Sequence, residues 1–347
     1  MKEVEKWLHD CSCNHLACSQ VKDKDTPLDI FLIDVVNRQI VPKRSDCQYL
    51  ALSYVWGGAC TFHLTKPRLK ELQEQGALLR HINAIPQVIR DAMRFTDQIN
   101  VQYLWVDSLC IIQDDPIHRD PQITHMNVIY RHAFATIINI SGQNAESRLP
   151  GVSLGSRSTL KPIKMRKGVE LQAIAPSLDL AILSSTYESR AWTYQERMLS
   201  SRCLYFTDWQ VYFQCRSSLR SEDNEPVQIA KRHLVNPILE FETRPQAAKD
   251  YFWLDFFRCY DSVVRNYTQR QLSDDEDKLR AFSGIASTLD ESGGGTFHYG
   301  LPGAILDLAL LWIPAGPMEH YCPRKYDEAS CTDYLPTWSW AGWQGAI

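Results

Sequence analysis

Four short apolar runs, separated by segments with helical character, constrain the fold of this 347-residue chain more than any other feature. The runs occupy residues 49–56, 103–107, 134–140 and 202–206. Runs of about four to eight apolar residues, bounded by turns such as Gly57-Gly58, are typical of strands buried on both faces. The segments between them that read as helices are residues 86–95, 126–133 and 190–199. This alternation predicts an α/β fold with one largely parallel sheet flanked by helices.

The segments on either side of this core have a different pattern. Residues 30–36 and 39–41 are β-rich and enclose the turn Asn37-Arg38, which predicts an N-terminal β-hairpin arm. Towards the C-terminus, residues 252–267 and 275–289 predict helices, and residues 335–340 predict an aromatic strand. We therefore expect three parts. They are an N-terminal Cys/His segment with the hairpin (1–45), the central domain (46–215) and a mainly helical C-terminal region (216–347).

Charge and hydropathy exclude several classes of protein. The formal net charge of −4 lacks the basic face that a nucleic-acid-binding protein needs. The first residues are charged and lead into no apolar signal core, and the apolar stretch 304–314 is interrupted by Asp307. Eleven cysteines at irregular spacing in a chain of this size fit reduced thiols. We expect a soluble, cytoplasmic protein with no membrane or nucleic-acid partner.

A compact Cys/His motif near the N-terminus is a candidate metal site. Cys11, His15 and Cys18, with Cys13 between them, offer zinc-type ligands within eight residues. Structural zinc sites usually combine two ligand pairs separated by a longer loop, so this spacing is atypical. The motif therefore allows two interpretations, a zinc site at Cys11, His15 and Cys18 or a packed N-terminal hook.

Several of these segments, in their order along the chain, resemble the signature blocks of heterokaryon incompatibility (HET) domains of filamentous fungi. The blocks are Ala51-Leu52-Ser53-Tyr54-Val55-Trp56-Gly57, the segment from Leu104 to Asp114, residues 126–130, and Ser189-Arg190-Ala191-Trp192-Thr193-Tyr194-Gln195-Glu196-Arg197. Residues 260–289 and Trp338-Ser339-Trp340 resemble later family elements. The resemblance implies an intracellular module linked to self/non-self recognition and programmed cell death.

HET domains are remotely similar to Toll/interleukin-1-receptor (TIR) domains, which implies a flavodoxin-like parallel sheet. The turn Ser53-Tyr54-Val55-Trp56-Gly57 is similar to the Ser-aromatic-x-Gly turn that follows the first TIR strand, and Asp107 is similar to the Asp that ends the second. The segment 184–196 resembles the one that carries the glutamate of NAD-cleaving TIR domains, here Glu196. The insertion 142–183 departs from that pattern.

The resemblance assigns roles to individual residues. It implies catalytic roles for Glu196 and Asp107, and a carboxylate suits the oxocarbenium-like state in which a nicotinamide–ribose bond breaks. The implied substrate-binding residues are Ser53, Tyr54, Trp56, Arg190 and Trp192. The alternatives are structural. Glu196 can belong to an ion-pair cluster with Arg190 and Arg197, and Asp107 can cap the turn that follows its strand.

Cys110 is a further candidate for catalysis. A thiol nucleophile needs a histidine within hydrogen-bond reach, and His118, His125 and His132 are the candidates. The alternative is a small buried apolar residue, which is the usual role of a lone cysteine after a strand.

Three hypotheses about function follow. In the first, the chain is a HET-domain effector that self-associates and hydrolyses NAD or a related nucleotide, with no cofactor required. In the second, it is a non-enzymatic signalling module that works by assembly. In the third, it is a small-molecule enzyme of fungal secondary metabolism that uses the same pocket.

Overall fold

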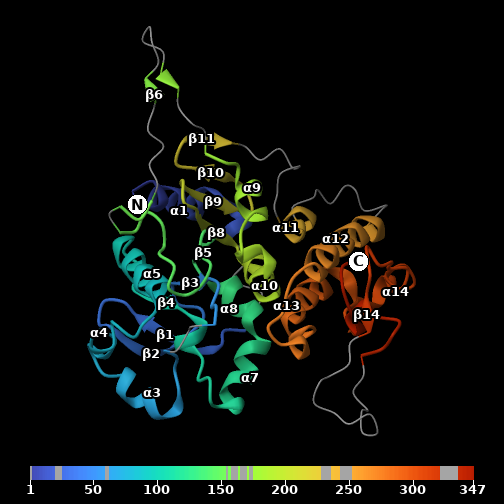
Figure 1. Cartoon of the computed structure of the whole chain (residues 1–347), viewed down its shortest axis with the longest axis horizontal. Coiled ribbons are helices and arrows are strands. Elements are labelled where there is room, and N and C mark those ends of the chain that lie inside the picture. Colours follow the sequence, from blue (N-terminus) through green and yellow to red (C-terminus); the bar gives the residue numbers. More distant parts are fainter. Residues whose placement is uncertain are drawn as a thin grey trace. The chain divides into compact units, whose positions relative to one another are not determined.

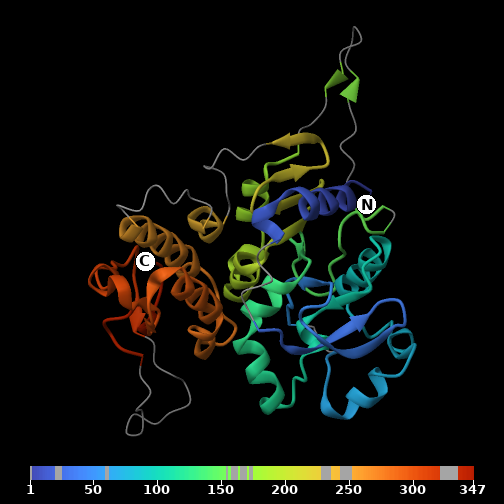
Figure 2. The same cartoon turned by 180° about the vertical axis from the view of Figure 1, so that it is seen from behind.

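The computed structural model describes residues 2–19, 26–58, 62–153, 155–157, 163–164, 170–171, 175–227, 236–242, 252–320 and 335–347. The chain divides into two compact units. The first, called the sheet unit below, comprises Met1–Ile123, Val128–Glu188 and Ser200–Ile229. The second, called the helical unit, comprises Thr124–Asn127, Ser189–Leu199 and Ala230–Ile347. Figures 1 and 2 show their elements from two opposite sides.

The sheet unit is built around a nine-stranded mixed sheet with the strand order β11-β10-β9-β8-β5-β3-β4-β1-β2. Its strands are β1 (Asp29–Asp34), β2 (Gln39–Arg44), β3 (Tyr49–Ser53), β4 (Tyr103–Trp105), β5 (Ala135–Asn139), β8 (Arg202–Phe206), β9 (Val211–Cys215), β10 (Leu219–Ser221) and β11 (Asn224–Val227). Neighbouring strands among β4, β3, β5 and β8 are parallel. The prediction of parallel strands is confirmed for these four, although the sheet as a whole is mixed. Every residue of β3, β5 and β8 is buried, which explains their continuous apolar runs.

The N-terminal hairpin forms one edge of this sheet. β1 and β2 pair antiparallel, as predicted, but β1 also pairs with β4. The hairpin is therefore a part of the central sheet and not a separate arm. Its turn is held by the buried carboxylate of Asp34, which accepts the backbone N–H groups of Val36 and Asn37 at 3.1 and 2.9 Å. Arg38 completes the turn with a positive φ of 55°.

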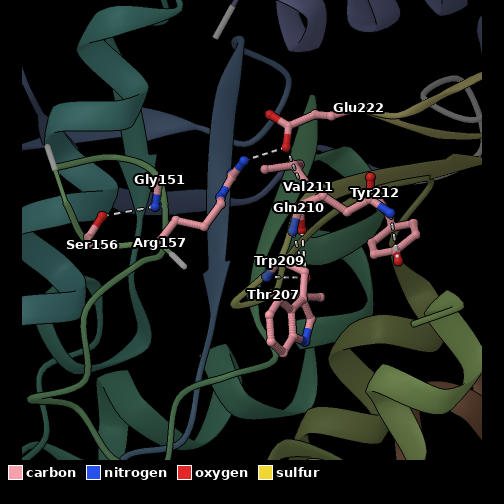
Figure 3. Close-up of polar contacts among 9 residues, drawn as sticks. All are labelled: Gly151, Ser156, Arg157, Thr207, Trp209, Gln210, Val211, Tyr212 and Glu222. Atoms are coloured by element: carbon pink, nitrogen blue, oxygen red, sulfur yellow. Dashed lines mark hydrogen bonds and ion pairs between the residues drawn. The ribbon is translucent and has the colours of Figure 1, made fainter. Parts of the chain in front are cut away.

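The opposite edge consists of β9, β10 and β11, which continue from β8 as an antiparallel meander. Figure 3 shows the turn between β8 and β9, where the Thr207 hydroxyl accepts the Gln210 N–H at 3.1 Å. The Glu222 carboxylate accepts the Val211 N–H at 2.9 Å and pairs with Arg157 from the loop after β5. The sheet thus continues beyond residue 215, where we expected the central domain to end.

Helices pack against this sheet. Those that precede residue 184 are α1 (Lys2–Asn14), α2 (Leu16–Ser19), α3 (Lys66–Leu72), α4 (Ala77–Arg80), α5 (Gln87–Gln98), α6 (Asp107–Cys110), α7 (Pro116–Thr124), α8 (Met126–His132) and α9 (Leu178–Leu183). α5 packs against β3 and β4, and α1 packs against β9, in front of the yellow strands in Figure 2. A short hairpin of β6 (Ile163–Lys164) and β7 (Glu170–Leu171) lies in the insertion. None of the described helices has the length and hydropathy of a membrane span.

The helical unit has an aromatic core. Its helices are α10 (Ala191–Leu199), α11 (Pro237–Glu242), α12 (Phe252–Thr268), α13 (Arg280–Leu289) and α14 (Leu306–Ala309). Tyr267, Phe282 and Trp340 meet at ring-centroid distances of 5.1 to 5.8 Å. The aromatic segment 335–340 is not the strand that we expected. It forms a turn that leads into a 3₁₀ helix, η8 (Trp340–Gly342), because the Ser339 hydroxyl accepts the Ala341 N–H at 3.0 Å. Only the next residues, β15 (Trp343–Gln344), pair with β14 (Glu319–His320).

Candidate functional site

The N-terminal segment presents one buried stripe. Val4, Leu8 and Cys11 are buried and recur at helical spacing along α1, and the same spacing continues to His15 and Cys18. The backbone continues in helical turns past the end of α1. The His15 N–H donates to the Cys11 carbonyl at 3.2 Å, and the Cys18 N–H donates to the His15 carbonyl at 2.9 Å. The three predicted ligands therefore lie on one face.

A fourth ligand comes from the sheet. Cys215, the last residue of β9, lies beneath this face, and its sulfur is 3.3 Å from Nδ1 of His15, 200 residues away in sequence. The ligand atoms of Cys11, His15, Cys18 and Cys215 all lie within 4.8 Å of one another. A zinc–sulfur bond of about 2.3 Å gives ligand–ligand distances of about 3.8 Å in a tetrahedron, so a small contraction suffices. These four residues, called the Cys/His cluster below, can hold a metal ion.

Polar groups surround the sulfurs of the cluster. The Ser217 N–H donates to the Cys215 sulfur at 3.4 Å, and the Ser218 hydroxyl lies 3.3 Å from it. Hydrogen bonds from Cys11 and Cys18 lower the pKa of Cys215, while the pKa of Cys11 is raised by the same sharing of protons. The donors around Cys215 favour negative charge on its sulfur, which is the state in which cysteine binds metals.

A second group of polar residues lies at the carboxyl ends of β3 and β4. The Asp107 carboxylate accepts the indole N–H of Trp56 at 2.7 Å and the backbone N–H of Ser108 at 2.7 Å. The hydroxyl groups of Tyr54 and Ser108 share a hydrogen bond of 3.1 Å. Trp56 and Asp107 are half-buried, whereas Ser53 and Tyr54 are buried. Sequence-predicted residues from two neighbouring strands thus meet at one edge of the sheet, called the carboxyl edge below.

The carboxyl edge also receives a residue from the segment 184–196, which resembles a segment of TIR domains. Tyr187 is fully buried in the sheet unit, and its hydroxyl shares a hydrogen bond of 2.6 Å with the hydroxyl of Ser53. Gly57 closes the turn after β3 with a φ of +66°, and a Cβ at this position would lie 2.6 Å from Cβ of Asn144. Glycine is therefore required where the loops after β3 and β5 touch.

Cys110 has the environment of a packing residue. Its sulfur accepts the Val106 N–H at 3.3 Å, and burial raises the pKa of its thiol to about 12. His118 accepts the Ile112 N–H at 3.3 Å through Nδ1, and Nδ1 of His132 lies 2.9 Å from the Ser45 hydroxyl. Because a neutral thiol is a weak nucleophile, these contacts favour the apolar alternative for Cys110.

The remaining predicted residues lie in the helical unit and are described separately. Arg190 donates to the Ser273 hydroxyl at 3.3 Å. Trp192 is half-buried and hydrogen-bonds Asp277. Glu196 and Arg197 on α10 are buried, with 5% and 2% of their surfaces exposed. A carboxylate this deeply buried needs compensating partners, whether its role is structural or catalytic.

A comparison with protein families identifies the central part of the chain. Residues 49–196, which contain the strands β3, β4 and β5 and the carboxyl edge, match the family model described as Heterokaryon incompatibility protein (HET). This part of the chain is therefore a HET domain, as the resemblance implied, and the match indicates a role in heterokaryon incompatibility. No curated protein and no solved structure matches the chain.

The sequence pattern alone missed two contributors to the Cys/His cluster. Cys215 stands in an apolar run and far from the N-terminal motif, so no spacing rule connects it to Cys11, His15 or Cys18. Arg202 begins a buried strand, and its charge in an apolar run was the available signal. Buried charges are rare unless paired, so a charge there points to a partner.

Proposed function

We propose that this chain is a HET-domain effector of fungal non-self recognition that triggers cell death by cleaving NAD or a related nucleotide. The hydrogen bond between Ser53 and Tyr187 carries the proposal. It joins the first signature block, at the carboxyl end of β3, to the beginning of the segment that resembles that of NAD-cleaving TIR domains. Two regions that the TIR resemblance relates are thus in contact within the sheet unit.

The strand order supports a flavodoxin-like and TIR-like interpretation. When the four parallel strands are numbered along the chain, the order β4-β3-β5-β8 corresponds to 2-1-3-4. Flavodoxin-like sheets begin in this way, and their ligands bind outside the carboxyl ends of the strands, where the order reverses. Trp56 and Asp107 are half-buried at that edge, and in this proposal they contact the nucleotide.

The proposed reaction is hydrolysis of the bond between nicotinamide and ribose. Water adds to the anomeric carbon, nicotinamide leaves with the bonding electrons, and the water loses a proton. Positive charge develops on the ribose in the transition state, and the Glu196 carboxylate stabilises it or holds the ribose hydroxyls. Trp192 lies one helical turn before Glu196 and provides a flat wall for a ring, and Arg190 binds substrate phosphate.

Glu196→Gln tests the catalytic role. The purified full-length chain is incubated at high concentration with NAD, and free nicotinamide is measured. The substitution should lower the rate about a hundred- to a thousand-fold, equivalent to about 2.7–4 kcal/mol of transition-state stabilisation. The melting temperature should not change, and Glu146→Gln, at an exposed position of the HET domain, should have no effect. A collapse of the melting temperature would instead assign Glu196 to an ion pair, whose disruption commonly costs about 3–5 kcal/mol.

The burial of Glu196 favours one other function, a non-enzymatic module that acts by assembly. With 5% of its surface exposed, Glu196 offers little contact to a ligand, and both Asp107 oxygens already accept hydrogen bonds. Expression of wild-type and Glu196→Gln chains in a fungal host separates the two functions. Cell death that persists at wild-type level without nucleotide cleavage would support assembly and contradict the nucleotidase.

For the Cys/His cluster we propose zinc as the bound ion. Three cysteine sulfurs and one imidazole nitrogen are a ligand set that zinc prefers, and four protein ligands leave no open position. The ion would thus be structural and would take no part in nucleotide chemistry. Metal analysis of the purified chain should find roughly one zinc ion per chain, and a chain purified from zinc-replete cells without any zinc would contradict this assignment.

A further inference from the structure

A buried arginine faces the Cys/His cluster without a carboxylate partner. Arg202, the first residue of β8, is only 5% exposed. Its Nε donates to the Cys11 sulfur at 3.1 Å, and its two Nη groups donate to the carbonyls of Phe134 and Cys18 at 3.2 and 3.3 Å. Among the described residues, none supplies a carboxylate within ion-pair distance of Arg202. Within the part of the chain that the structure describes, the guanidinium therefore faces sulfur and carbonyl groups and no carboxylate within ion-pair distance.

Metal binding supplies the missing negative charge. A buried cation is costly without an anionic partner, because the interior solvates charge poorly. When the three thiols bind zinc they release their protons, and three thiolates carry one negative charge more than the ion neutralises. The guanidinium of Arg202 balances that charge through its hydrogen bond to Cys11. The arginine and the metal centre thus each compensate for the burial of the other.

We propose that Cys11, His15, Cys18 and Cys215 form a single charge-balanced metal centre, with Arg202 as its positioning residue, that clamps the N-terminal segment onto the HET-domain sheet. The proposal rests on zinc as the ion and adds what the centre does. Three ligands come from residues 11–18, the fourth comes from β9, and the balancing charge comes from β8. Two strands that extend the parallel sheet are thereby cross-linked to the beginning of the chain.

The segment also packs directly against the sheet unit, with Val4, Trp7 and Leu8 of α1 buried. Trp7 stacks on Phe213 of β9 at 6.3 Å, and Asp10 pairs with Arg220 at 2.9 Å. Exposed and half-exposed ion pairs contribute little to the free energy of unfolding, roughly 0–1 kcal/mol each. The side of the segment away from the sheet is polar, with Cys13 exposed. The metal centre is therefore expected to fix the end of the segment, residues 11–18, whereas the apolar side chains of α1 attach its beginning.

A cavity gives the ion a path to the centre. It has a volume of about 610 Å³ and lies at the amino ends of the parallel strands, with Cys18, Phe134 and Arg202 in its lining. Glu5 and Asp46 also line it, so the approach carries negative charge that favours a divalent cation. A chelator of moderate size should accordingly be able to remove the metal from the folded chain.

The ligand set is tested with Cys215→Ser and a matched control, Cys13→Ser, in the full chain. Cys13 lies beside the motif but is exposed and outside the cluster, so its variant should keep roughly one zinc ion per chain. Cys215→Ser should lose zinc on dialysis. Cobalt titrated to saturation without dialysis provides a second readout, because sulfur-to-cobalt charge-transfer absorption should fall by about a third when one of three thiolates is lost.

The positioning role is tested with Arg202→Gln and Arg202→Lys. Loss of the charge should weaken zinc binding about 10- to 100-fold, the usual effect of removing a group that supports a metal ligand. Lysine keeps the charge and should restore part of the affinity. The charge-transfer band of the cobalt form should shift in Arg202→Gln, because the Cys11 sulfur loses its hydrogen bond, whereas a merely structural role would leave the band in place.

The clamp is tested by hydrogen exchange with and without a zinc chelator. Removing zinc should speed exchange of the amides in residues 2–19 and 211–215 and leave residues 252–268 of the helical unit unchanged. A wild-type chain that never binds zinc would overturn the assignment of the ion. The clamp would be overturned if Cys215→Ser kept its zinc and if removing zinc from the wild type did not speed exchange in residues 2–19. A smaller zinc site at the N-terminus would then remain.

Discussion

The N-terminal and C-terminal segments of this chain are attached to their units by different chemistry. In the sheet unit, residues 2–19 are attached by the packing of Val4, Trp7 and Leu8 and, in our proposal, by an ion held in the Cys/His cluster. In the helical unit, residues 335–347 are attached through Trp340, which is fully buried against Tyr267 and Phe282. Its indole N–H donates to the Tyr260 hydroxyl at 3.1 Å.

This difference determines how each attachment responds to its surroundings. A large aromatic side chain buries much apolar surface and needs no ligand, so its contribution does not depend on solution metal. Sulfur and imidazole groups bury little apolar surface, and their contribution follows the concentration of free ion. In our proposal the attachment of residues 11–18 therefore depends on the ion, whereas the C-terminal attachment is built into the fold.

Trp340→Ala should have the largest effect. Truncation of a buried tryptophan leaves a cavity and commonly costs about 3–5 kcal/mol of unfolding free energy. Urea denaturation of the variant measures this loss. Trp338→Ala is the matched control, since Trp338 is 44% exposed and contacts Tyr299 alone among the described rings, so its loss should cost about 1 kcal/mol or less. Equal effects of the two substitutions would contradict the role given to Trp340.

Lys278 should make the stability of the C-terminal attachment depend on pH. Its ammonium group donates to the carbonyls of Trp340 and Trp343, and burial lowers its pKa from 10.5 to about 8, with Asp275 acting in the opposite direction. Below pH about 8 the lysine is protonated in both the folded and the unfolded state. Between about 8 and 10.5 the unfolded state binds more protons, so stability rises with pH, by roughly 3 kcal/mol in total.

Comparison with Lys278→Met isolates this effect from other groups that titrate in the same range. The difference in unfolding free energy between wild type and variant should grow as the pH is raised from about 8 to 10.5. A difference that stays constant over this range would show that Lys278 titrates normally.

Zinc removal should have the next largest effect and should be confined to the sheet unit. With free zinc at 100 times its dissociation constant, the ion stabilises the folded state by about 2.7 kcal/mol, and a chelator abolishes that contribution. Urea denaturation at controlled free zinc measures the change. The Trp340→Ala chain should show the same zinc dependence as wild type, because its lesion lies in the other unit. Loss of zinc binding in Trp340→Ala would contradict the view that the two attachments are independent.

Ser339→Ala should have the smallest effect. The Ser339 hydroxyl accepts the Ala341 N–H at 3.0 Å and donates to the Tyr299 carbonyl at 2.6 Å, so it caps the 3₁₀ helix that positions Trp340. Removal of such a cap typically costs about 1 kcal/mol. Thermal denaturation should show a small decrease that Ser339→Thr largely restores. A loss as large as that of Trp340→Ala would mean that the cap, and not the ring, holds the segment.

Much of the sheet could be predicted from the sequence because a buried parallel strand must be apolar along its whole length. The runs at β3, β5 and β8 have this property, and each is buried throughout. The segment 335–340 was misjudged for a related reason. Aromatic residues are common in strands and in packed turns alike, and only the contacts of Trp340 distinguish the two.

The candidate sites could be predicted only where their members are close in sequence. The stripe of Cys11, His15 and Cys18 follows from helical spacing, which is a local property of the backbone. The residues of the carboxyl edge could be named from the ends of strands. The sequence did not indicate that the Trp56 indole would hydrogen-bond Asp107 or that the Tyr187 hydroxyl would hydrogen-bond Ser53.

The sequence by itself determined what depends on spacing along a single element: the central parallel strands, the main helices, the signature blocks and three candidate metal ligands. The tertiary structure alone decided the order of the strands, the approach of Cys215 to His15 and the position of Arg202 beside Cys11. The physical reason is that local periodicity fixes which face a side chain occupies. Which distant face packs against it depends on how the whole chain buries its apolar surface.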